Sequence, residues 1–154
     1  MATPLHSNTL AGWREWVAIP EIGVDWIKAK IDTGARTSSL HAFDLEEGGD
    51  TVAFWVHPWQ ESERDAVKVE CPIFDRRIVR SSSGHSEERI VVLMDLVLVG
   101  RAVTAELTLT NRDAMGFRML IGREVLRQGF VVDPARSFLG GRAPRPVRQA
   151  NRGR

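Results

Sequence analysis

The sequence predicts an all-β protein, either a sandwich or a barrel, with one short helix near its C-terminal end. Between Trp13 and Leu126, short apolar alternations are separated by turn residues, which is typical of strands that bury one face. Only residues 123–128, REVLRQ, show a helical pattern, and Gly129 ends it. With 154 residues, the chain has the length of one compact domain.

The expected strands follow one another along the chain. Residues 15–19 and 24–31 form a hairpin across the turn PEIG, and the second strand of this hairpin ends at Asp32. The other expected strands are each bounded by turn or loop residues and comprise residues 51–58, 67–73, 76–80, 89–99, 102–110 and 117–122.

We expect one folded domain, residues 13–140, between two extensions. Residues 1–12 are predicted to be a flexible N-terminus. Residues 141–154, GRAPRPVRQANRGR, hold five arginines, two prolines, no acidic residue and no apolar periodicity. This composition predicts a disordered basic tail.

The composition also limits the class of protein. A net charge of +1 and 43% hydrophobic residues argue against a disordered chain and against a nucleic-acid partner held by bulk charge. No stretch approaches the length of a membrane span, and the opening MATPLHSNTLAG lacks the features of a signal peptide. A lone cysteine, Cys71, agrees with a reducing compartment. We therefore expect a cytoplasmic protein with neither a membrane nor a nucleic-acid partner.

The segment KAKIDTGARTSSL, residues 28–40, places an acidic residue at the end of a strand. Apolar residues alternate with two lysines before Asp32, which is the period of a half-buried strand with the lysines on its polar face. Gly34 permits a tight turn, and the hydroxyl of Thr33 is able to lock it by hydrogen bonding. We expect this loop to hold the Asp32 carboxylate in a fixed position.

Three further motifs accompany this segment. They are the hairpin tip SSSGHSEER (81–89), the strand and helix MGFRMLIGREVL (115–126), and VVDP (131–134). Their order resembles the retropepsin-like aspartic peptidases over roughly residues 15–133. The longer motifs look like the bacterial branch of these proteins that is labelled ATP-dependent zinc proteases.

The resemblance implies a retropepsin-like closed barrel, the acid-protease fold, with one short C-terminal helix. It implies that Asp32 is catalytic and that Thr33 and Gly34 hold two such loops together. Because one chain offers one such aspartate, it implies a homodimer whose Asp32 loops face each other across a two-fold axis. The residues implied to continue or support the site are Ala35, which contacts substrate, and Gly122 with Arg123, which lie beneath the loop.

The polar hairpin corresponds to the flap of the resembled family. Substrate contacts are implied at Arg80, Ser82, Ser83 and Gly84. Arginines 76, 77, 80 and 89 flank this hairpin and are either solvated strand residues or a means of attracting an acidic substrate. Members of the resembled family work beside enzymes that ligate glutamate, which implies a peptide or protein substrate rich in glutamate.

The sequence departs from the viral members of the family at two places. Viral members carry an acid four residues after the catalytic aspartate, where it pairs with the arginine of the Gly-Arg element. This chain has Arg36 at that position, so Arg123 needs another partner. The viral flap is also rich in glycine, whereas the tip here contains only Gly84, so we expect closure to be less mobile or to depend on hydroxyl contacts.

Two other functions remain open at this stage. The first is a non-catalytic module that keeps the barrel and binds peptides or regulates another protein. The second is a zinc protease, as the family label says. His41, His57, His85 and Cys71 are dispersed and form no recognisable zinc motif. No phosphate-binding Gly-x-x-x-x-Gly-Lys-Ser/Thr loop is present either. We therefore expect neither a metal nor another cofactor.

Overall fold

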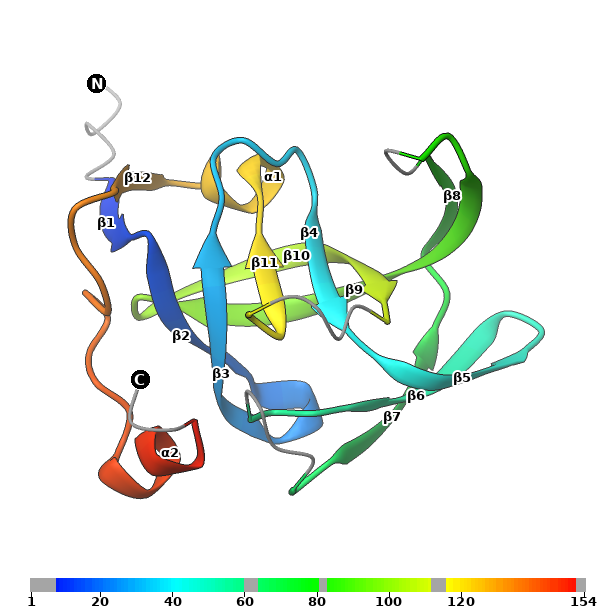
Figure 1. The fold of residues 1–154 in the computed structure, drawn as a ribbon, viewed down its shortest axis with the longest axis horizontal. Helices are drawn as coiled ribbons and strands as arrows, with labels where there is room; N and C mark the ends of the chain where they lie inside the picture. Colours follow the sequence, from blue (N-terminus) through cyan, green and yellow to red (C-terminus); the bar gives the residue numbers. More distant parts are fainter. Residues whose placement is uncertain (1–7, 60–63, 81–82, 112–115, 152–154) are drawn as a thin grey trace, which may run out of the picture.

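The computed structural model describes residues 8–59, 64–80, 83–111 and 116–151, and most of these residues form strands (Figure 1). The strands are β1 Thr9–Gly12, β2 Arg14–Ile19, β3 Val24–Ile31, β4 Ser38–His41, β5 Phe43–Gly48, β6 Thr51–Val56, β7 Val67–Pro72, β8 Asp75–Arg80, β9 Ser86–Leu98, β10 Arg101–Thr110, β11 Met119–Ile121 and β12 Phe130–Asp133. A short 3₁₀ helix, Pro20–Ile22, and two α-helices, α1 Arg123–Leu126 and α2 Arg145–Ala150, complete the described elements.

Six strands close into a barrel. The order β10-β4-β11-β3-β2-β9 becomes a ring because β9 also pairs with β10, from Arg101↔Leu98 to Thr108↔Val91. Closure removes the exposed edges that an open sheet would present. The all-β fold and the retropepsin-like barrel predicted from the sequence are confirmed.

β9 belongs to the barrel and to a hairpin that projects from it. Its first half pairs with β8, from Arg80↔Ser86 to Asp75↔Val91, and its second half pairs with β10 and β2. The β8–β9 hairpin therefore rises from the barrel at the upper right of Figure 1, on the side to which the β3–β4 connection also points. A separate sheet of β5, β6 and β7 covers the lower right of the barrel.

One hydrophobic core fills the barrel and extends under the three-stranded sheet. Burial of each large side chain in such a core contributes about 1.5–3 kcal/mol to stability. The largest apolar side chains that are almost completely buried are Ile19, Ile27, Leu40, Phe54, Leu96, Leu98, Leu107, Met119 and Ile121. Every one comes from a strand of the alternating pattern, or directly from its end.

Two charged residues of the first hairpin are buried, contrary to the simple alternation. Lys28 is 2% exposed, and its ammonium lies over the rings of Trp16 and Phe138 at 5.2 and 5.8 Å. Glu15 is fully buried and accepts hydrogen bonds from the backbone N–H groups of Leu139 and Gly140. The segment after β12 covers both residues, and a sequence pattern restricted to one hairpin does not show this cover.

Both chain ends differ from the predicted extensions. Within the N-terminal segment predicted to be flexible, residues 9–12 form β1, which pairs in parallel with β12. Within the tail predicted to be disordered, residues 145–150 form α2, and Ala143 and Asn151 are buried. The prolines suggested a break, but proline is compatible with the first turn of a helix, and Pro146 occupies that turn. Residues 1–7 and 152–154 of these predicted extensions lie outside the described residues.

Neither α1 nor α2, nor any other helix in the part of the chain that the structure describes, is long and apolar enough to cross a membrane.

Replacement of Glu15 by alanine is expected to destabilise the fold by roughly 3 kcal/mol. The Glu15 carboxylate accepts three backbone N–H groups, from Gly12, Leu139 and Gly140, at 2.7–3.0 Å. Loss of the carboxylate leaves these donors without their partner, and a buried donor left unsatisfied costs about 1–3 kcal/mol. Chemical denaturation measures the loss. Glu70→Ala, an exposed change on β7, is the control, and equal stability of the two variants would contradict this role for Glu15.

Candidate active site

The Asp32 loop, residues 32–37, connects β3 to β4 at the upper end of the barrel in Figure 1. Its first residue folds the turn around its own side chain. The backbone N–H of Gly34 donates to Asp32 Oδ1 at 2.9 Å, and the N–H of Ala35 donates to the Asp32 carbonyl at 3.2 Å. One carboxylate oxygen of Asp32 is therefore held by the turn that the sequence predicts.

A second element, β11 followed by α1, lies beneath the Asp32 loop and holds its backbone. The N–H of Asp32 donates to the Ile121 carbonyl at 2.8 Å. The N–H groups of Arg123 and Glu124 donate to the carbonyls of Ala35 and Arg36 at 2.8 and 3.1 Å. The first N–H groups of a helix lack partners within the helix, and here the loop carbonyls accept two of them. These hydrogen bonds fix the backbone of Asp32 and Ala35 relative to β11 and α1.

Gly122 is the point of closest approach between the two elements. A Cβ atom at this position would lie 2.4 Å from the Thr37 carbonyl oxygen and 2.9 Å from that of Ala35. The N–H of Gly122 donates to Ser38 Oγ at 3.0 Å, and Ser38 is 1% exposed. Ser38 thus supports the site, although sequence analysis did not single it out. No sequence signal marked Ser38, because the predicted strands did not include residues 38–41, which form β4.

The Gly-Arg element has a different pairing from that of the viral proteins. Arg123 donates from Nη1 to the Thr33 carbonyl at 3.0 Å, which is the alternative partner that the position of Arg36 required. Arg36 instead lies 3.5 Å from the carboxylate of Glu124. In this ion pair the loop supplies the arginine and α1 supplies the acid, which is the reverse of the viral arrangement.

The structure places three of the four predicted hairpin contacts at the surface. Arg80, Ser83 and Gly84 are exposed, and Gly84 has φ +85°, a conformation that favours glycine. Ser82 lies outside the described residues. The hairpin and the Asp32 loop lie at the same end of the barrel (Figure 1).

Three of the arginines predicted to attract an acidic substrate already have carboxylate partners. Arg76 lies 2.5 Å from Glu47, Arg77 lies 2.5 Å from Glu106, and Arg89 lies 3.1 Å from Glu87. These hydrogen bonds raise the pKa of Arg76 and Arg77, and the bond from Arg77 lowers the pKa of Asp75. Their positive charge is largely compensated within the chain, so Arg80 is the better candidate for a contact with an acidic substrate.

The histidines considered for zinc do not form a metal site. His57 stacks on Phe43 with ring centroids 4.0 Å apart, and His41 lies 5.9 Å from His57. His85 is exposed on the hairpin, and burial raises the pKa of the Cys71 thiol. Among residues 8–59, 64–80, 83–111 and 116–151, no group of three or more His, Cys, Asp or Glu side chains is arranged to hold a metal ion.

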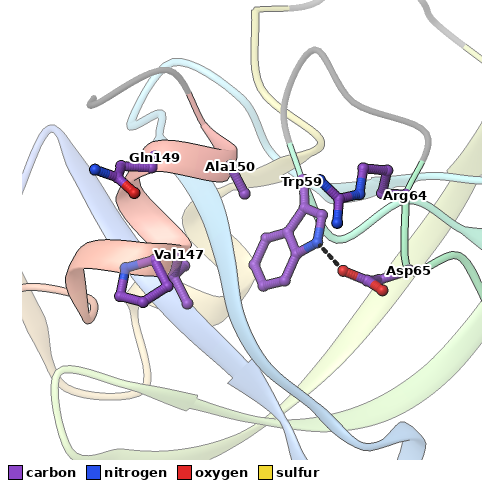
Figure 2. Close-up of a pocket in the computed structure, with 7 residues that line it drawn as sticks. Trp59, Arg64, Asp65, Val147, Gln149 and Ala150 are labelled. Atoms are coloured by element: carbon purple, nitrogen blue, oxygen red, sulfur yellow. Dashed lines mark hydrogen bonds between the residues drawn. The ribbon is translucent and has the colours of Figure 1, made fainter.

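A large hollow of the protein lies far from Asp32. It measures about 440 Å³ and lies between α2 and the segment around Trp59, whose indole N–H donates to Asp65 at 2.8 Å (Figure 2). α2 occupies the opposite end of the molecule from the β3–β4 connection (Figure 1).

Residues 10–143 match a family described as "RimB-like: Retropepsin-like aspartic endopeptidase RimB". The match spans most of the chain and includes the Asp32 loop and α1. The chain therefore belongs to this family of retropepsin-like aspartic endopeptidases. The description agrees with the resemblance that the sequence motifs carry, and it names aspartic rather than zinc chemistry.

Similar proteins extend this comparison. A probable alpha-L-glutamate ligase from Desulfotalea psychrophila is 45% identical over 133 residues, which cover 84% of this chain and 29% of the relative. A protein of the same name from Shewanella pealeana is 46% identical over 136 residues, covering 86% and 30%. The chain thus spans about three tenths of the length of these relatives. The crystal structure of Lpg0085 from Legionella pneumophila, a protein of unknown function, superposes with a TM-score of 0.72 at 26% identity and covers 87% of this chain and 99% of that one.

Replacement of Gly122 by alanine is expected to displace the Asp32 loop and to cost about 2 kcal/mol or more in stability. The new methyl group would meet backbone carbonyls, which cannot rotate away as a side chain can. Thermal unfolding and NMR chemical shifts of Gly34 and Ala35 measure the two effects. Gly48→Ala is the control, because a Cβ there meets only Thr51 Oγ1, at 3.4 Å. Unchanged shifts and stability in the Gly122 variant would contradict the close contact.

Proposed function

We propose that the protein is an aspartic peptidase whose site forms when two copies of Asp32 meet across a homodimer axis. The observation that carries this proposal is a carboxylate held by the backbone on a surface loop, supported from below by β11 and α1. Thr33 and Gly34 are exposed on the isolated chain, so a second loop has access to them. Membership of the retropepsin-like family supports the same reading.

The chemistry requires two carboxyl groups in different protonation states. Like charges a few ångströms apart cannot both ionise, so a pair of Asp32 side chains shares one proton. The ionised carboxylate removes a proton from a water molecule, which attacks the carbonyl carbon of the peptide bond. The protonated carboxyl group donates its proton to the carbonyl oxygen. When the tetrahedral intermediate breaks down, its C–N bond breaks and the amide nitrogen leaves with the proton that the pair took from water. One hydroxyl group of the intermediate returns a proton to the pair, which restores the starting state.

Exposed apolar side chains on β1 and β12 support the proposed homodimer. β1 and β12 lie next to α1 at the upper left of Figure 1. Leu10 and Val131 are direct neighbours in this pair of strands, with 39% and 47% of their surface exposed. Exposed apolar residues that are adjacent favour contact with a second molecule, which we propose is a second copy related by a two-fold axis.

We further propose that the substrate is a peptide or protein tail rich in glutamate, in the cytoplasm. The support comes from relatives named probable alpha-L-glutamate ligase, in which a segment similar to this chain is part of a longer protein. A ligase that adds glutamate and a peptidase that removes it would act on the same chemical group. Exposed Arg80 on the hairpin is suited to contact a glutamate carboxylate. The free thiol of Cys71 agrees with a reducing compartment.

Replacement of Asp32 by asparagine is expected to abolish hydrolysis of an oligo-α-glutamate peptide while preserving dimerisation and thermal stability. Asparagine has nearly the same shape, and its side-chain oxygen can still accept the hydrogen bond from Gly34. It cannot exchange the proton that the reaction needs. Cleavage is followed by mass spectrometry on protein purified free of host proteases.

A chelator and a matched variant separate the three functions considered. In an aspartic peptidase, chelation leaves the parental rate unchanged, whereas a zinc protease loses its activated water. A binding module cleaves no peptide in either form. Asp25→Asn, an exposed change at the opposite end of β3, is the control and should keep full activity. Parental activity in the Asp32 variant would refute the proposal.

A site shared by two chains also predicts that specific activity falls when the protein is diluted. Because each chain supplies half of the site, dissociation removes activity from both halves. Leu10→Arg should shift this fall to higher protein concentration, because it puts a charge into the apolar contact. Leu45→Arg, at a position of the same 39% exposure on β5, should leave it unchanged. Sedimentation that finds a fully active monomer would contradict the dimeric site.

A further inference from the structure

A groove runs beside α2, at the end of the molecule opposite the β3–β4 connection (Figure 1). The hollow of about 440 Å³ between α2 and the Trp59 segment adjoins a second hollow of about 340 Å³, and both are lined by Trp59, Asp65 and Val147. The second hollow extends to Trp26, near the start of β3. We call the two hollows together the α2 groove. The proposed peptidase chemistry at Asp32 does not use it.

Contacts with distant parts of the chain hold Trp59 in place. Its indole N–H donates to Asp65 Oδ2 at 2.8 Å, and its carbonyl accepts a hydrogen bond from Arg118 Nε at 3.2 Å. Figure 2 shows the indole ring between α2 and Asp65. The Trp59 side chain is only half-buried, so part of its ring is accessible to a ligand in the groove.

Packing holds the second tryptophan, Trp26. Its ring meets that of Trp16 edge to face, with centroids 6.3 Å apart, and Trp16 stacks on Phe138 at 5.7 Å. Trp16 is buried, whereas Trp26 is half-buried. The α2 groove therefore contains two accessible tryptophan rings that the chain itself supports.

The charge in the second hollow favours a cation. One carboxylate oxygen of Asp65 accepts the hydrogen bond from the indole, and the other oxygen has no hydrogen-bond partner among the described residues. None of the described residues that line the second hollow is basic, whereas Arg64 lines the first. A cationic group in the second hollow would therefore contact a carboxylate and two aromatic rings.

Apolar side chains form much of the remaining wall of the second hollow. They are Val24, Pro58, Val67 and Val147. A ligand that fits both the apolar and the charged parts has an alkyl stem and a cationic end, as arginine and lysine side chains do. Arginine fits better, because its planar guanidinium stacks on aromatic rings and donates hydrogen bonds to a carboxylate from fixed directions.

We propose that the α2 groove binds an arginine side chain of a partner protein, with the guanidinium on Trp26 and Trp59 and hydrogen-bonded to Asp65. The alkyl stem then lies against Val67 and Val147. The groove is a protein-interaction site separate from the Asp32 loop, and this inference does not depend on whether the protein is a peptidase.

Titration with a blocked pentapeptide that carries one arginine among alanines tests the site. The control is the same peptide with citrulline, which has nearly the shape of arginine but no charge. We expect the arginine peptide to shift the indole N–H NMR signals of Trp26 and Trp59, and not that of Trp55 on β6. The citrulline peptide should bind at least about tenfold more weakly.

Three results of this titration would overturn the proposal. They are equal binding of the two peptides, a shift centred on Trp55, and no binding of the arginine peptide at millimolar concentration. The first would show an apolar groove without preference for a cation, and the others would show that the peptide has no site here.

Replacement of Asp65 by asparagine removes the charge and keeps the groove. The asparagine oxygen can still accept from the Trp59 indole, and asparagine tolerates the left-handed φ of +60° at this position. Arginine-peptide binding should weaken by at least about tenfold, with citrulline-peptide binding unchanged. Asp50→Asn, an exposed change between β5 and β6, is the control. Asp32→Asn should also bind like the parent, and a loss of binding there would show that the peptide uses Asp32 instead.

A second copy of this chain is the other source of an arginine, because residues 141–154 include five. The described part of this segment packs on its own molecule, where Ala143 and Asn151 are buried, which favours an arginine from another protein. Sedimentation without peptide separates the two sources. We expect equal self-association of the parent and of Asp65→Asn. Weaker self-association of the variant would show that a second copy supplies the arginine, and the proposed partner would be wrong.

Discussion

The candidate site depends on the close approach of two backbones, that of the Asp32 loop and that of Gly122 at the end of β11. No side chain fits between them, because a Cβ at Gly122 would lie 2.4 Å from a carbonyl oxygen of the loop. This proximity lets the first N–H groups of α1 reach the carbonyls of Ala35 and Arg36. The position of the Asp32 carboxylate is therefore set by main-chain contacts, which vary less than contacts between flexible side chains.

The barrel brings the remaining parts of the site to the same end. β9 is the longest of the described strands, and it pairs with β8 in the hairpin before it pairs with β10 and β2 in the barrel. The hairpin is thus an extension of a core strand, and at its base β9 pairs with both β8 and β10. The buried carboxylate of Glu15 acts similarly at the other side, where it fixes the segment after β12 over the first hairpin. The β8–β9 hairpin and the segment after β12 are thus each attached to a well-packed strand.

Local pattern was sufficient for the fold class, for most strands and for the turn at Asp32. Alternation shows which residues face the core, and the Thr-Gly turn shows where the carboxylate is fixed. Contacts between distant segments were not visible in the sequence. The cover over Lys28, the pairing of β1 with β12 and the helix after Pro144 all depend on partners about 110 or more residues away or on packing, so the two predicted extensions were wrong for residues 9–12 and 145–150. The pairing of three hairpin arginines with acids was likewise visible only in the structure.

The central claim is that two Asp32 carboxylates form one site, and the distance between them in the assembled protein tests it most directly. A crystal structure of the dimer at a pH where the proposed peptidase is active would provide this distance. The account predicts a two-fold axis between the Asp32 loops and carboxylate oxygens about 3 Å apart, close enough to share a proton. A dimer that holds the two carboxylates too far apart to share a proton, directly or through one water molecule, would contradict it.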